Sequence, residues 1–137
     1  MPRAWRSARI PPSPQSRGVV ASYVANLALL STHQADAAFQ REWELFQVPG
    51  GIGFFLGFNV VALALLLFGL VEVSRSSARA GVFVLILSGT GLFTVCIHAT
   101  FLGLGHPEFR SVPSLLVLGA VFAVSVMQLV LKQRASR

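Results

Sequence analysis

The residues in this sequence that could do chemistry are histidines and carboxylates. His33 and Asp36 lie three positions apart, so a helix would present both side chains on one face. Imidazole and carboxylate groups are typical ligands of divalent metals such as zinc and iron, and a metal with an open position could activate water. We expect a polar site built from His33, Asp36 and His98, which binds a divalent metal or a lipid-soluble ligand, with a further ligand atom from one of four other residues. These four are Glu42, Glu44, His106 and Glu108.

Four long apolar segments have to position these side chains. They cover about residues 18–40, 52–73, 81–104 and 112–131. Each has about 20 residues or more, which is enough for a helix to cross roughly 30 Å of hydrocarbon. Backbone groups in lipid need the internal hydrogen bonds of a helix. The sequence therefore predicts an all-α integral membrane protein, with a four-helix transmembrane bundle over 18–132.

Composition favours a membrane protein over a soluble one. Of the 137 residues, 54% are apolar and 12% are charged, whereas soluble domains have about 25% charged residues. A single cysteine, Cys96, excludes an internal disulfide and a CxxC metal or redox motif. The sequence also has no phosphate-binding loop and no GxSxG motif. The partner that composition identifies is the lipid bilayer.

The placement of the basic residues explains the net charge of +6. Nine of the eleven lie before the first apolar segment, between the second and third, or after the fourth. The positive-inside rule then places both termini in the cytoplasm, with 1–17 as a flexible, proline-rich basic tail and 133–137 as a second tail. We expect a bacterial inner-membrane protein whose polar site faces the extracytoplasmic side. We expect no nucleic-acid partner, because a separate basic domain is missing.

The first apolar segment continues into polar sequence. Residues 19–48 contain no proline or glycine, so the pattern predicts one long helix that crosses the membrane and reaches the outer interface. A polar stripe on that helix runs from Ser22 through His33 to Glu44 and should face the other helices. Polar residues expected to hydrogen-bond between helices are Asn26, Gln40, Asn59, Thr94 and Gln128. Residues expected to form an interfacial aromatic belt are Phe39, Trp43 and Phe46.

Two alternatives for the N-terminal region stay open. Residues 1–37 also fit a secretory signal peptide, with a basic start, an apolar stretch and the small-residue sequence Ala35-Asp36-Ala37. Cleavage after Ala37 would remove His33 and Asp36 from the mature protein. The arginine- and serine-rich start is also similar to an organelle transit peptide.

Two segments resemble a family of small, functionally uncharacterised bacterial four-helix membrane proteins. The resemblance covers about residues 20–130, and the H-x-x-E-E membrane proteins are a more distant likeness, with Asp36 in place of their first glutamate. The first segment comprises His33-x-x-Asp36-Ala37, Glu42-Trp43 and Pro49-Gly50-Gly51. The second comprises His98, Gly105-His106-Pro107-Glu108-Phe109 and Ser114. The resemblance implies no reaction, but it marks His33, Asp36, Glu42, Trp43, His98 and Glu108 as positions to test.

Two other classes of function also fit the polar stripe. A non-enzymatic membrane subunit would use it to pack helices, dock a partner or relay protons, within a homo-oligomer or with a partner subunit. A small carrier would need a dimer, because four helices make a thin bundle. The metal content of the purified protein would distinguish these two classes from a metal-binding protein.

Overall fold

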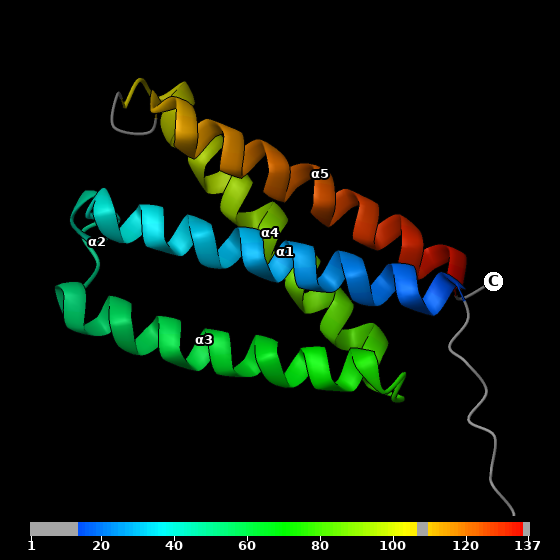
Figure 1. Cartoon of the computed structure of the whole chain (residues 1–137). Coiled ribbons are helices and arrows are strands. Elements are labelled where there is room, and N and C mark those ends of the chain that lie inside the picture. Colours follow the sequence, from blue (N-terminus) through cyan, green and yellow to red (C-terminus); the bar gives the residue numbers. More distant parts are fainter. Residues whose placement is uncertain (1–13, 107–109, 136–137) are drawn as a thin grey trace, which may run out of the picture.

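The computed structural model describes residues 14–106 and 110–135, and this part of the chain is all-helical (Figure 1). The elements are α1 (Pro14–Phe39), α2 (Glu42–Leu45), α3 (Gly51–Ser74), α4 (Ala80–Gly103) and α5 (Val112–Ala135). Most of the predicted N-terminal tail, the end of the predicted C-terminal tail and Glu108 lie outside the described residues.

The first helix has different ends from those predicted. Its described part starts at Pro14, so the helix reaches into the expected tail. It ends at Phe39 and does not continue to Val48. Arg41 adopts a left-handed conformation with φ 56°, and the four-residue helix α2 follows it. The prediction of one helix over 19–48 is therefore wrong.

The other three long helices pack around α1, which contacts each of them. Figure 1 shows α1 and α5 running side by side, with α4 crossing behind them and α3 on the other side of α1. α4 also packs against both α5 and α3. The chain ends of α1 and α4 that carry His33 and His98 are thereby brought to the same end of the molecule.

Three helices are long and apolar enough to cross a membrane, namely α3, α4 and α5. In α3, 11% of the most apolar 18-residue window is buried inside the protein, against 28% in α4 and α5. α1 carries polar side chains on its buried face, including Ser22, Asn26 and His33. Its role as a fourth span stays a prediction.

Hydrogen bonds between buried side chains join α1 to α5. The Asn26 side-chain amide donates to Oε1 of Gln128 at 2.7 Å and to Oγ of Ser125 at 3.1 Å. All three residues are fully buried. Gly91 of α4 lies against this group, since a Cβ there would be 2.3 Å from Oγ of Ser125. Asn59, in contrast, donates within its own helix to the carbonyl of Phe55, so the expected bond between helices is not formed there.

Gly69 sets the close approach of α3 to α1. The Tyr23 hydroxyl crosses from α1 and donates to the carbonyl of Leu66 at 2.9 Å. A Cβ on Gly69 would lie 2.3 Å from that hydroxyl and 2.6 Å from Cδ1 of Phe83. The Tyr23 and Phe83 rings are both buried. Small residues permit such approach between membrane helices.

We predict that Gly69→Ala destabilises the protein by about 1–3 kcal/mol, because the added methyl group overpacks two buried aromatic rings. The measurement is the melting temperature of the purified protein in mild detergent. Gly57→Ala is the matched control on the same helix, since a Cβ there would meet nothing within 4 Å. An equal melting temperature for the two variants would contradict the packing described here.

Candidate metal centre

The turn after α1 directs Glu42 and Trp43 into the protein. Left-handed Arg41 reverses the chain, and its guanidinium pairs on the surface with Glu44. Glu42 is then 5% exposed and Trp43 9% exposed. The Trp43 ring packs against Phe55 of α3, with centroids 5.2 Å apart. Trp43 is therefore a buried packing residue and not part of an exposed aromatic belt.

His33, Glu42 and His98 form one buried cluster, which we call the His–Glu cluster. Each of the three residues offers a ligand atom, and these atoms all lie within 4.8 Å of one another. The two imidazole rings meet edge to face, with centroids 4.7 Å apart. Three separate elements, α1, α2 and α4, supply the three side chains. Residues 65 positions apart in sequence are thus brought into contact.

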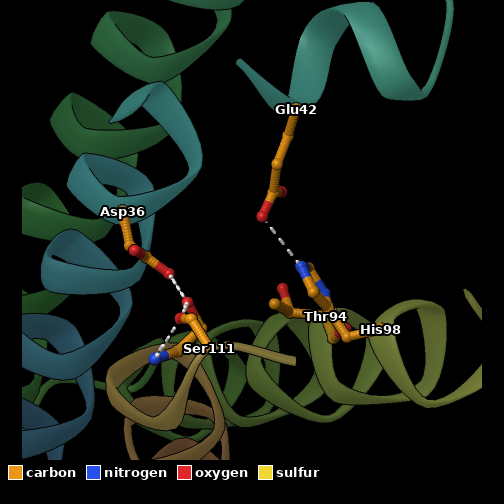
Figure 2. Close-up of polar contacts among 6 residues, drawn as sticks. Asp36, Glu42, Thr94, His98 and Ser111 are labelled. Atoms are coloured by element: carbon orange, nitrogen blue, oxygen red, sulfur yellow. Dashed lines mark hydrogen bonds and ion pairs between the residues drawn. The ribbon is translucent and has the colours of Figure 1, made fainter. Parts of the chain in front are cut away.

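The hydrogen bonds of His98 fix the position of its ring proton (Figure 2). Nδ1 lies 2.9 Å from the carbonyl oxygen of Thr94, which can only accept a hydrogen bond, so Nδ1 is the donor. In neutral His98, Nε2 then carries the lone pair. Nε2 lies 3.1 Å from Oε1 of Glu42. A lone pair and a carboxylate oxygen at this distance need a proton or a metal cation between them.

His33 adds an unsatisfied polar atom to the His–Glu cluster. Its Nδ1 is buried and has no hydrogen-bond partner among the described residues. A buried imidazole nitrogen without a partner is costly, and such an atom calls for an explanation such as a bound water or ion. This nitrogen belongs to the residue whose ring touches His98.

The donor set fits a zinc-type metal. Two histidines and one glutamate are the three protein ligands of one class of catalytic zinc sites, which leave the fourth position open. Bonds of about 2.0–2.2 Å in a tetrahedron put ligand atoms roughly 3.3 Å apart. Nε2 of His98 and Oε1 of Glu42 are already 3.1 Å apart. The bond from Nδ1 of His98 to a backbone carbonyl is the usual outer-shell support of a metal-binding histidine.

Asp36 is not part of the His–Glu cluster, contrary to the prediction that it pairs with His33. Its Oδ2 accepts a hydrogen bond from Oγ of Ser114 at 2.5 Å, and this bond joins α1 to the start of α5 (Figure 2). Oγ of Ser111 in turn accepts from the backbone N–H of Ser114 at 3.2 Å, as a helix N-cap does. Asp36 therefore braces the helices beside the His–Glu cluster.

The other candidate residues lie outside the His–Glu cluster. Glu44 is exposed beside Arg41, and His106 is exposed with its ring 5.2 Å from that of Phe101. Gln40 lies in the turn after α1. Phe39 is 83% exposed, and Phe46 packs against Phe101. Thr94 contributes its backbone carbonyl and not its side chain to the site.

Sequence reasoning gave Glu42 and Ser114 too little weight. Glu42 was one of four choices for a further ligand, and a straight helix would have kept it away from the two histidines. Ser114 has no sequence signal that links it to Asp36, which lies 78 positions away. The Ser111-x-x-Ser114 spacing signals only the start of a helix.

A cavity of about 280 Å³ opens beside the His–Glu cluster. It lies between α1, α2, α3 and α4, and its lining is mostly apolar and aromatic. The lining includes all three cluster residues together with Trp43, Phe46, Phe54, Phe55, Phe58, Phe93 and Ile97. A metal held by the three cluster residues would border this cavity.

Comparison with known proteins yields one family. No curated protein and no solved structure matches the chain. The expectation of a functionally uncharacterised family is confirmed, because the sequence pattern of a family of unknown function, DUF6713, matches residues 19–135. The match extends from the first turns of α1 to the last residue of α5. The chain therefore belongs to the DUF6713 family.

Proposed function

We propose that this chain is a metal-binding membrane protein, in which His33, Glu42 and His98 hold one divalent ion, with zinc as the best match to the donor set. The main observation in favour of this proposal is the buried Nδ1 of His33, which has no partner among the described residues. His33 belongs to the same cluster as the His98–Glu42 contact. One cation among the three side chains would satisfy both features, because each histidine would donate a lone pair to it and the carboxylate would balance its charge.

The metal would have an open position toward the adjoining cavity. Three protein ligands leave one place in a tetrahedron for water or for an oxygen of a ligand. A metal in that position polarises a bound oxygen group or lowers the pKa of bound water. The lining of the cavity is mostly apolar and aromatic. The site therefore suits chemistry on, or binding of, an oxygen-bearing group on an apolar molecule.

In this proposal the protein crosses the membrane four times as a helical bundle, and α1 is the fourth membrane-spanning helix. α1 is supported as a span because its polar side chains Ser22, Asn26 and His33 are buried against other helices and not exposed to lipid. The basic turn between α3 and α4 carries Arg75 and Arg79 and would lie in the cytoplasm. The His–Glu cluster lies at the opposite ends of the helices, on the extracytoplasmic side, in a bacterial inner membrane.

A second function rests on the same 3.1 Å contact. If a proton and not a metal joins His98 to Glu42, the contact is a buried ion pair that fixes α2 on α4. The chain would then be a non-enzymatic subunit or carrier. His33 separates the two functions, since its Nδ1 takes no part in such an ion pair.

We predict that the protein purified in mild detergent and dialysed against zinc retains about one zinc per chain. His33→Ala, Glu42→Gln and His98→Ala should each weaken zinc binding by more than the roughly 100-fold typical of an outer-shell loss. The measurement is elemental analysis beside competition with a zinc indicator. His106→Ala and Glu44→Gln are matched controls outside the cluster and should keep zinc. Zinc that stays bound in His33→Ala would contradict the three-ligand site.

We predict that zinc also stabilises the fold, because it binds the folded cluster and links three helices. At a free zinc concentration 100 times the dissociation constant, the stabilisation is about 2.7 kcal/mol. The measurement is the melting temperature with zinc and with a chelator. The rise should appear in the wild type and in His106→Ala and disappear in His33→Ala. A rise that survives His33→Ala would show that zinc acts elsewhere.

We predict that the His–Glu cluster lies on the extracytoplasmic side of the membrane. The measurement is the labelling of single cysteines placed in a Cys96→Ser background. His106→Cys, in the exposed stretch after α4, should react with a membrane-impermeant maleimide in spheroplasts. Ala78→Cys, in the exposed turn between α3 and α4, should react only after lysis. The reverse pattern would invert the topology and place the cluster toward the cytoplasm.

A further inference from the structure

A second cavity, of about 290 Å³, adjoins the one beside the His–Glu cluster. It lies between α1 and α3, and Thr90 of α4 also lines it. Gln34, Phe55, Phe58 and Thr90 line both cavities, so the two meet around these side chains. Together they form a groove that leads from the α1–α3 interface to His33, Glu42 and His98.

The groove exists because α1 and α3 are packed closely at only one end. Near Gly69 the Tyr23 hydroxyl reaches the Leu66 carbonyl, and no space remains for a Cβ. Toward the other end, small residues of α1 line the cavity, namely Ser31, Ala35 and Ala38. The facing part of α3 carries Ala62 and Asn59. The two helices therefore leave a space that their own side chains do not fill.

The lining of the groove suits hydrocarbon better than water. Most of it is apolar, and two of its polar side chains are already satisfied within their own helices. Asn59 donates to the carbonyl of Phe55, and Oγ1 of Thr90 donates to that of Ile86. An apolar space does not hold ordered water, and an empty one loses dispersion contacts.

The length of the groove matches one lipid chain. Its lining runs from Leu66 to Phe54 along α3, which is about 18 Å of helix at 1.5 Å per residue. One leaflet of a bilayer is about 15 Å deep, half of the roughly 30 Å hydrocarbon core. α3 is also the candidate span with the smallest buried share, so its flanks lie next to lipid.

We propose that this groove binds one hydrocarbon chain of a membrane lipid, whose oxygen-bearing head group reaches the His–Glu cluster. This inference rests on the proposed function, because it names the class of molecule that would occupy the open metal position. The apolar chain would lie between α1 and α3, and the head group would lie beside Trp43 and His98. A free fatty acid and a phospholipid share this chemistry.

The test is photolabelling of the purified protein with palmitic acid that carries a diazirine in its chain, and with phosphatidylcholine that carries the same chain. Labelled peptides should map to residues 27–38 of α1 and 54–66 of α3 with one probe or both, and the probe that labels identifies the source of the head group. Unlabelled lipid of the same kind should compete. Ala62→Trp fills the groove and should reduce labelling about tenfold, which corresponds to 1.4 kcal/mol.

Val60→Trp is the matched control, since Val60 lies on the same helix, is 69% exposed and does not line the groove. Labelling spread evenly over all lipid-facing helices, without competition and equal in both variants, would overturn the inference while leaving zinc binding intact. Competition against wild-type labelling keeps the test decisive if Ala62→Trp does not fold. Labelling of the groove that persists in His98→Ala supports the lipid chain even where the metal site itself has failed.

Discussion

The contact between Glu42 and His98 is the interaction on which the end of the molecule near His33 depends. It joins the four-residue helix α2 to the long apolar helix α4 across 56 sequence positions, and both side chains are almost fully buried. A carboxylate and an imidazole are tolerated there only with a compensating proton or cation, because an unpaired charge is costly away from water. The position of α2, the burial of Trp43 and the mouth of the neighbouring cavity all follow from how this pair is satisfied.

The two ends of the helices are built differently, and the difference assigns them different roles. At the end near Gly69, backbones approach until a single Cβ would clash, which is the packing expected where lipid gives no hydrophobic drive between helices. Between the ends, the Asn26–Gln128 pair fixes α1 against α5. At the end near His33, the helices leave cavities, and Nδ1 of His33 is buried there with no partner among the described residues. A closely packed end beside an end with cavities is typical of proteins that hold a site on a rigid scaffold.

The helical segments were predictable from the sequence, but the identity of the cluster was not. Hydropathy alone located α3, α4 and α5, because twenty apolar residues in lipid have few alternatives to a helix. The turn at Arg41 carries no glycine, asparagine or proline, so no local signal ends α1 before it. That single residue decides whether Glu42 continues along a helix or turns inward. The choice between Asp36 and Glu42 as the partner of the histidines was therefore beyond any helical-wheel argument.

The left-handed conformation of Arg41 links the stability of the turn to the state of the His–Glu cluster. A residue with a side chain costs of order 1 kcal/mol in this conformation, and its neighbours must hold it there. Those neighbours are Glu42 and Trp43, the residues that close the cluster. By reciprocity, if an occupant of the cluster stabilises this turn by some factor, the formed turn raises the affinity for that occupant by the same factor. Arg41 is exposed and directly precedes Glu42, so a substitution there that relaxes the turn would loosen Glu42 without removing any side chain of the cluster.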